Sequence, residues 1–245
     1  MYRFTQRSGN NEHGSNYLAS VSDLMAGLLF IFVILVVFAV HSMSVKERQI
    51  EQIRNHLAGN DIALRDLLVR LHEELQIAYV PVEIDETNGI LRIPEESLTF
   101  ATGKADLSLE AKEVLSTVRK ILEKELVCYS KGHELRKCVH KNPHGHTLDA
   151  VFIEGHTDNQ PYGGDRTGTK NRRLSTDRAN AVYEALLFKE GILYSFKNPA
   201  GESLFSLSGY GADRPVPGHV HKRPTDDPMN RRIELRFIMT APTLE

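Results

Sequence analysis

An uncharged apolar run near the N-terminus, residues 24–40, limits the structures open to this chain more than any other part of its sequence. Its 17 residues would form about 25 Å of α-helix at ~1.5 Å per residue. A bilayer core is about 30 Å thick, so a spanning helix must also include flanking residues, and the uncharged segment 17–22 is suitable. The sequence therefore predicts a transmembrane helix over residues 17–44, with Asp23 inside the hydrocarbon region.

Asp23 heads this run, and two interpretations fit it. A carboxylate inside a membrane costs on the order of 2.5–3.5 kcal/mol on insertion scales, so it usually serves a function. That function would be to carry a proton or to bind a cation on a path across the membrane. Alternatively, Asp23 lies at the membrane interface and caps the helix by accepting hydrogen bonds from its N-terminal amides.

The remaining composition narrows the class of protein. A chain of 245 residues with a formal net charge of -2 gives no indication of a nucleic-acid partner. A cleaved signal peptide is disfavoured, because its apolar core usually has about 7–15 residues and follows a short basic stretch. Basic residues flank the apolar run on both sides, so the positive-inside rule leaves the orientation open.

Two segments flank the predicted membrane helix. Residues 1–16 are polar and are predicted to be a loosely attached tail, whereas residues 45–78 are predicted to be a helical linker. The linker carries an apolar stripe with nearly heptad spacing, interrupted at Gly59 and Asn60. We expect this stripe to pair with a second copy of the chain; packing against the chain's own domain is the alternative. The stripe consists of Ile50, Ile53, Leu57, Leu64, Leu67, Leu68, Leu71 and Leu75.

Residues 79–245 change to a mixed pattern that predicts an α/β (α+β) domain. Amphipathic patterns predict helices at 108–126 and 175–190, the second with Ser175 as its N-cap. Strands separated by helices imply βαβ units with right-handed crossovers. Strands are predicted at 89–94, 150–153, 204–208 and 233–238.

Cys128 and Cys138 close a short loop in this domain, and they predict a disulfide if the domain lies in an oxidising space. Histidines in or near the loop raise the alternative of a metal site, because Cys/His tracts can bind zinc. Their spacing matches no standard zinc pattern, so we expect solvated histidines and no metal. These histidines are His133, His140, His144 and His146.

Three segments, in order, resemble the motifs of the OmpA-like peptidoglycan-binding domain. Residues 100–107 are similar to that family's F-x-x-G-x-x-x-L opening. Residues 153–159 and 171–179 resemble its G-H-T-D … N-x-x-L-S-x-x-R-A signature, and residues 209–235 resemble its G-x-G … P … N-R-R-V/I-E ending. The resemblance implies a βαβαβ domain that binds peptidoglycan.

The OmpA-like family binds the diaminopimelate of the peptidoglycan stem peptide, which carries both an ammonium and a carboxylate group. By this resemblance Asp158 binds the ammonium and Arg178 binds the carboxylate, since a guanidinium matches a carboxylate bidentately. The resemblance also places Asn159, Leu174 and Arg231 in the same cleft. The structural alternative is an Asp158–Arg178 pair that holds the loop to the helix.

His156 lies within the same signature and is of a residue type that often acts as a catalytic base. No serine or cysteine nucleophile and no metal set accompanies it, so we expect this histidine to be structural. We therefore expect that the protein is not an enzyme.

The order of parts, from a membrane helix headed by an aspartate to a helical linker and a wall-binding domain, resembles the MotB family of stator subunits. Residues 22–30 have the pattern S-D-L-M-x-G-L-L-F. This pattern departs from flagellar MotB and looks more like the small MotB-like subunits of Zorya anti-phage systems. The alternatives are a flagellar MotB-type stator subunit and a passive tether between the membrane and the cell wall.

This resemblance implies an ion-driven rotary motor in the bacterial inner membrane. Asp23 would carry the translocated proton or sodium ion, and no other cofactor is expected. Two copies of the chain would lie within a ring of a larger MotA-like or ZorA-like membrane subunit. Binding to peptidoglycan would place the N-terminus in the cytoplasm and the C-terminal domain, residues 79–245, in the periplasm.

Overall fold

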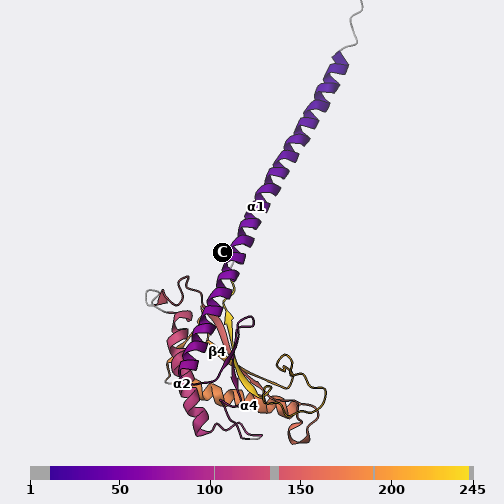
Figure 1. Cartoon of the computed structure of the whole chain (residues 1–245). Coiled ribbons are helices and arrows are strands. Elements are labelled where there is room, and N and C mark those ends of the chain that lie inside the picture. Colours follow the sequence, from indigo (N-terminus) through magenta and orange to yellow (C-terminus); the bar gives the residue numbers. More distant parts are fainter. Residues whose placement is uncertain (1–11, 102, 133–137, 190, 243–245) are drawn as a thin grey trace, which may run out of the picture. The chain divides into compact units, whose positions relative to one another are not determined.

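The structure is a computed structural model of the chain, and it describes residues 12–101, 103–132, 138–189 and 191–242 (Figure 1). The chain divides into two compact units, with the boundary between Asn55 and His56. Most of the predicted tail 1–16 and one loop histidine, His133, lie outside the described residues.

Helix α1, Glu12–Ile77, contains the apolar run. Among the described residues it is the one helix long and apolar enough to cross a membrane, and its most apolar 18-residue window has a mean hydropathy of 2.8. The large apolar side chains of residues 24–40 are exposed along it. The segments predicted as a transmembrane helix and a linker therefore form one continuous helix.

Asp23 lies about three turns inside α1, which begins at Glu12. An N-cap residue lies at the helix boundary, where its backbone is not helical. The interpretation of Asp23 as a cap is therefore wrong for this helix. Its interpretation as the ion-carrying residue stays a prediction.

The predicted interruption at Gly59 and Asn60 is absent from α1, because both residues contact the rest of the second unit instead of breaking the helix. A Cβ at Gly59 would lie 2.7 Å from His146 Cε1, so the close approach requires glycine. The Asn60 amide donates to Thr240 O at 2.8 Å, and Asn60 Oδ1 lies 2.8 Å from His146 Nδ1. Glycine and asparagine often mark a turn, but here they lie within a helix and contact His146 and Thr240.

The C-terminal part of the apolar stripe packs into the chain's own domain, which differs from the predicted pairing with a second copy. Ile50 and Leu57, nearer the N-terminus, are 65% and 47% exposed. The folded domain consequently begins near His56 rather than at residue 79. Heptad spacing does not distinguish packing against a second copy from packing against the chain's own domain, because either contact buries one face of the helix. The buried positions are Ala63, Leu67, Leu68, Leu71 and Leu75.

In the part of the chain that the structure describes, five strands form one mixed sheet in the order β1-β2-β5-β3-β4. Strands β3 and β4 are parallel and are connected through α4, whereas β5 pairs antiparallel with both β2 and β3. The strands are β1 Glu83–Asp85, β2 Ile90–Pro94, β3 Leu148–His156, β4 Phe205–Gly211 and β5 Arg232–Met239. After α1 come α2 Leu109–Leu126, η1 Val127–Tyr129, η2 Tyr162–Gly164, α4 Thr169–Leu186 and α5 Ile192–Ser195. The predicted α/β (α+β) class is confirmed, while the short strand β1 is missed by the sequence pattern.

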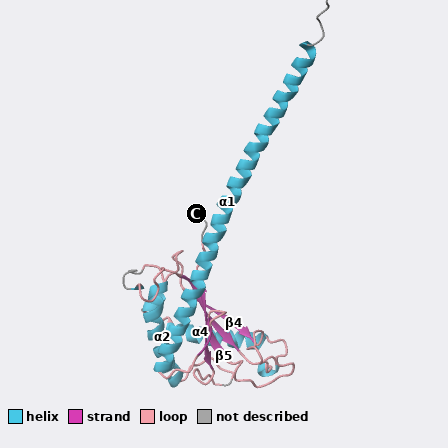
Figure 2. Ribbon diagram, turned by 45° about the horizontal axis from the view of Figure 1, so that its top comes forward, coloured by secondary structure: helices cyan, strands magenta, loops and turns pink. Residues whose placement is uncertain are grey.

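The two faces of the sheet differ, because side chains alternate along each strand. Leu91, Ile153 and Leu235 lie on the apolar face and join the core. Helices α2 and α4 and the end of α1 cover this face (Figure 2). An Arg70–Glu125 ion pair at 3.1 Å connects α1 to α2.

Helix α4 begins at Thr169, so the predicted start at Ser175 is wrong. Its N-cap position is taken by Gly168, whose φ of 75° is left-handed. Ser175 is buried inside the helix, where its hydroxyl donates to Arg172 O and accepts from Gly211 N, both at 2.8 Å. The first turn of α4 is polar, so hydrophobic periodicity does not mark it.

Cys128 and Cys138 are bonded to each other in the structure, with their Cα atoms 5.4 Å apart. The neighbouring Tyr129 is fully buried. Its hydroxyl accepts from Arg70 Nη2 at 2.7 Å and donates to Lys141 O at 3.0 Å. The cysteine loop is thereby attached to α1.

Two glycines let α4 approach the sheet closely. Gly155 on β3 and Gly209 on β4 are register partners. A Cβ at Gly155 would lie 2.0 Å from Ser175 O, and one at Gly209 would lie 2.2 Å from Thr176 Oγ1. We expect Gly155→Ala to lower the free energy of unfolding by about 1–3 kcal/mol, because the added methyl group forces the backbone of α4 outward.

Denaturant unfolding of the full chain in detergent measures this effect. Gly27→Ala is the control, because among the described residues a Cβ at that position meets nothing within 4 Å beyond its chain neighbours and the backbone of its own helix. If Gly155→Ala were as stable as the unmodified chain, the close contact between α4 and β3 would be contradicted.

Candidate functional site

A pocket of about 360 Å³ lies at the carboxyl end of β3. The start of α4, the segment after β2 and the loop before β5 also contribute side chains to it. Four of the five predicted ligand-binding residues line it: Asp158, Leu174, Arg178 and Arg231. The other lining residues are Glu95, Phe100, Gly103, Thr157, Gln160, Pro161, Tyr162, Gly163, Asn171 and Asp226.

The fifth predicted residue, Asn159, holds a neighbouring loop instead of lining this pocket. Its side-chain amide donates to His221 O at 2.9 Å and to Arg223 O at 2.8 Å. Its Oδ1 accepts from Thr225 N at 2.7 Å. Because backbone groups occupy both ends of this side chain, the structure gives Asn159 the role of fastening the loop to the end of β3.

Arg178 extends from α4 to the pocket and is buried. Its Nε donates to Lys104 O at 3.1 Å, and its guanidinium lies 4.9 Å from the centroid of the Phe100 ring. Within the described part of the chain, no hydrogen bond or ion pair involves its two Nη atoms. Burial lowers the pKa of Arg178, but arginine remains charged because its ordinary pKa is above ~12. Its Nη atoms are therefore suited to bind a ligand carboxylate.

Arg231 holds three carboxylates around one guanidinium group. Its Nε lies 2.6 Å from Glu95 Oε2, its Nη1 lies 2.6 Å from Asp158 Oδ2, and Asp226 is the third partner. Burial acts to lower the pKa of Arg231, but these carboxylates outweigh burial and raise it. Asp158 thus pairs with Arg231, and the alternative of an Asp158–Arg178 pair is not what the structure shows.

The charges of the pocket suit a ligand that itself carries both signs of charge. Arg178 offers two N–H groups to a carboxylate, in the geometry that favours bidentate binding. Asp158 and Glu95 offer oxygen atoms to an ammonium, which would take over part of their contact with Arg231. Phe100 adds an apolar surface beside Arg178. This arrangement can bind and orient a zwitterionic group.

Sequence reasoning did not assign ten of the lining residues to the pocket, among them Glu95, Tyr162 and Asp226. The two acidic residues lie in the loops after β2 and before β5, where isolated acidic residues are common and carry no pattern. The Tyr162 hydroxyl donates to Gly103 O at 2.7 Å and so connects two loops of the pocket. Its position shortly after the G-H-T-D motif was the available signal.

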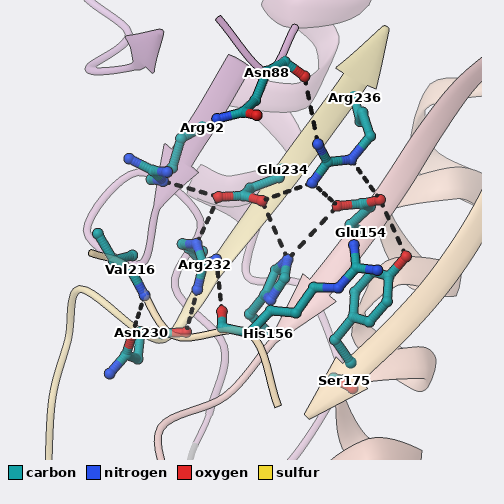
Figure 3. Close-up of polar contacts among 12 residues, drawn as sticks. Asn88, Arg92, Glu154, His156, Ser175, Val216, Asn230, Arg232, Glu234 and Arg236 are labelled. Atoms are coloured by element: carbon teal, nitrogen blue, oxygen red, sulfur yellow. Dashed lines mark hydrogen bonds and ion pairs between the residues drawn. The ribbon is translucent and has the colours of Figure 1, made fainter. Parts of the chain in front are cut away.

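The sheet face opposite the helices carries a buried network of charges (Figure 3). Glu154 and Glu234 are register partners on β3 and β5, and like charges opposite each other are unfavourable. Three arginines compensate for them. Arg92 Nε and Arg232 Nε lie 3.0 and 2.8 Å from Glu234 Oε1, and Arg236 makes two contacts of 2.9 Å with Glu154.

His156 lies in this network, where it is buried and stacked on Tyr210 with the ring centroids 5.4 Å apart. Its Nε2 lies 3.4 Å from Glu234 Oε2. Burial lowers the pKa of His156 and so favours the neutral imidazole. Ligand atoms of His156, Glu154 and Glu234 lie within 4.8 Å of one another, but arginines already bind both carboxylates. These contacts agree with a structural role for His156.

Fold and pocket together define a class of protein in which a long apolar helix precedes an α+β domain with a zwitterionic pocket. No family model matches the chain. The chain is similar to the Zorya protein ZorB of Escherichia coli (strain ATCC 8739, Crooks), at 23% identity over 256 residues, covering 96% of this chain and 92% of that protein. This match confirms the resemblance to the small MotB-like subunits of Zorya systems that the sequence motifs predict.

Two solved structures are also similar to the chain. One is a putative MotB-like protein from Desulfovibrio vulgaris, at 22% identity, with 74% of this chain and 96% of that chain covered and a TM-score of 0.46. The other is the cell wall anchor of the T6SS from Pseudomonas aeruginosa, at 21% identity, with coverages of 70% and 95% and a TM-score of 0.43.

Proposed function

We propose that this chain is the small, wall-anchored subunit of an ion-driven motor in the bacterial inner membrane, acting in defence against phage. The observation that carries the proposal is the position of Asp23 inside the apolar helix of a chain similar to ZorB along almost its whole length. A carboxylate in that position is costly unless it has a function. In this proposal Asp23 binds and releases the translocated proton or sodium ion.

The motor requires a moving partner and a fixed subunit. Two copies of this chain lie within a ring of a larger ZorA-like membrane subunit, and each change in the charge of Asp23 alters its attraction to that ring. One charge crossing the membrane releases about 2.3 kcal/mol per 100 mV, which is enough to bias a rotation step. The exposed Ile50 and Leu57 on α1 support pairing of the two copies along this helix.

The pocket anchors the chain by binding the diaminopimelate of peptidoglycan. Arg178 takes the carboxylate, and Asp158 takes the ammonium, with Glu95 and Arg231 around it. Because peptidoglycan lies outside the inner membrane, the domain from His56 onward is periplasmic and the N-terminus is cytoplasmic. The Cys128–Cys138 bond suits an oxidising space of this kind.

Binding to isolated peptidoglycan tests the anchor. We expect Arg178→Gln to weaken binding by about 10- to 100-fold, because a charge-assisted hydrogen bond contributes roughly 1.5–3 kcal/mol. The measurement is co-sedimentation of the full chain in detergent with peptidoglycan that contains diaminopimelate. Peptidoglycan with lysine in its place lacks the second carboxylate, and we expect the unmodified chain to bind it more weakly.

Arg173→Gln is the matched control, since Arg173 lies on the same helix with its side chain exposed. It should bind peptidoglycan like the unmodified chain. Thermal unfolding of both variants checks that the domain is intact. Full binding by a folded Arg178→Gln variant would show that this pocket does not bind peptidoglycan.

A further inference from the structure

The loop between β4 and β5 brings together two histidines and an aspartate that no sequence motif marks as a site. His219 Nδ1 lies 2.9 Å from Asp227 Oδ2, and His221 Nε2 lies 2.6 Å from the same oxygen. One ligand atom from each residue lies within 4.8 Å of the others. The two histidines are two positions apart in the loop, and a ring nitrogen of each reaches the same Asp227 oxygen.

The carboxylate of Asp227 is held in place by its neighbours. Its Oδ1 accepts from Met229 N at 3.0 Å, which leaves Oδ2 directed at the two imidazoles. The buried Asn230 amide donates to Asp227 Oδ2 at 3.3 Å and to His219 O at 2.9 Å. Hydrogen bonds from His221 and His219 keep the pKa of Asp227 at about 2, so this carboxylate is ionised at neutral pH.

We propose that His219, His221 and Asp227 form a binding site for one divalent transition-metal ion, with Zn²⁺ as the preferred ion. Two imidazole nitrogens and one carboxylate oxygen are ligands that Zn²⁺ accepts, whereas Mg²⁺ and Ca²⁺ prefer oxygen alone. Three protein ligands leave a position for water. The side chains of His219 and His221 are 38% and 31% exposed, so an ion can reach them.

Asn230 supplies the outer contacts that such a site needs. Residues that orient metal ligands through hydrogen bonds commonly change affinity by about 10- to 100-fold when they are replaced. Asn230 binds the ligand Asp227 and the backbone of the ligand His219, and its Oδ1 accepts from Val216 N at 2.9 Å. Asn230 therefore connects the ligand Asp227 to the backbone of the loop at Val216 and His219.

A metal ion here would stabilise one wall of the ligand pocket. Asp226, next to the proposed ligand Asp227, contacts Arg231 in the pocket. Asn159 holds the carbonyl of the proposed ligand His221. The ion would thus restrain the loop from which Asp226 reaches the pocket. Metal binding itself does not depend on peptidoglycan binding or on ion transport.

Without a metal, the same three residues form a hydrogen-bonded cluster in which both imidazoles share one carboxylate oxygen. The two interpretations differ in their response to added metal. A hydrogen-bonded cluster gains nothing from Zn²⁺, whereas a metal site gains stability that increases with the logarithm of the Zn²⁺ concentration above the Kd.

The test titrates the full chain in detergent, after treatment with a chelator, with Zn²⁺ and separately with Mg²⁺ and Ca²⁺. We expect saturable binding of about one Zn²⁺ per chain, a melting temperature that rises with Zn²⁺ concentration, and no response to the other two ions. Co²⁺ absorption provides a second readout, because ligand-field bands report nitrogen and oxygen coordination. His221→Gln should weaken Zn²⁺ binding by more than about tenfold, since it removes a ligand rather than an outer contact.

The double variant His144→Gln with His146→Gln is the control, because these histidines form a separate group in which their ring centroids lie 6.1 Å apart. It should bind Zn²⁺ like the unmodified chain. Absence of Zn²⁺ binding by the unmodified chain would overturn the proposal. Full binding by His221→Gln, or loss of binding in the control, would also overturn it, and none of these outcomes bears on the proposed anchoring function.

Discussion

Replacing Asp23 by asparagine is expected to abolish phage protection completely while the chain still inserts and assembles. Asparagine has nearly the shape of aspartate but carries no ionisable group, so it cannot bind and release a proton or exchange a cation. Phage protection is measured as plaque formation on cells that express the intact operon. Membrane fractionation and co-purification of the larger partner subunit show whether insertion and assembly are retained.

Two further variants make this experiment specific. Asp23→Glu keeps the carboxylate and is expected to retain part of the activity. Asp61→Asn removes an exposed aspartate from α1 beyond the apolar run and is expected to retain all of it. Loss of swimming alone in Asp23→Asn would indicate a flagellar stator subunit. Full phage protection by Asp23→Asn would contradict the ion-carrying role of Asp23 and would favour a passive tether between membrane and wall.

Arg232→Gln is expected to lower the free energy of unfolding by about 1.5–3 kcal/mol, because it removes the charged hydrogen bond of one of the two arginines that contact the buried Glu234 carboxylate. Arg232 is 4% exposed and lies 2.8 Å from Glu234 Oε1. Its Nη2 also donates to Arg214 O at 3.0 Å. Denaturant unfolding of the full chain in detergent measures the loss.

Arg172→Gln is the matched control for Arg232→Gln. Arg172 lies 3.1 Å from Asp213 Oδ2, but the two side chains are 53% and 63% exposed. Solvent screening limits such a pair to less than about 1 kcal/mol. Equal losses from Arg172→Gln and Arg232→Gln would mean that the network on the sheet is solvated rather than buried.

The pH profile gives Arg232→Gln a second readout. Burial acts to raise the pKa of Glu234, but His156 and Arg232 outweigh it and place the pKa below its ordinary range. The stabilisation is therefore present above the unfolded pKa of about 4.3 and is lost as the pH falls below it. In Arg232→Gln the pKa of Glu234 rises, so the variant should lose less stability than the unmodified chain between neutral and acidic pH.

For residues that are close together along the chain, the sequence alone was enough to predict that they meet in one pocket. Asp158 follows β3, and Leu174 and Arg178 lie on α4, the next long helix, so a single strand-loop-helix unit places all three. The pairing of Asp158 with Arg231 could not be predicted in this way. It depends on β5 lying beside β3, an antiparallel pairing between distant segments that no local pattern reveals.

Strand β3 shows why the predicted ends of the strands differ from those in the structure. The apolar run predicts only residues 150–153, whereas the strand extends over Leu148–His156. Its end contains Glu154 and His156, which are buried because arginines on β5 neutralise the carboxylates. A buried charged face has the same sequence pattern as a solvated one, so alternation indicates a strand without telling which face is buried.

The pairing of Asp158 with Arg231 determines how a single pocket holds its ligand. Because this ion pair exists before any ligand arrives, an incoming ammonium exchanges one partner for another, and the net gain in free energy is small. Under the proposed function, one pocket then binds one stem peptide reversibly. In the proposed dimer, two such pockets facing a mesh of identical peptides would achieve avidity, since each pocket can release and rebind while the other stays bound.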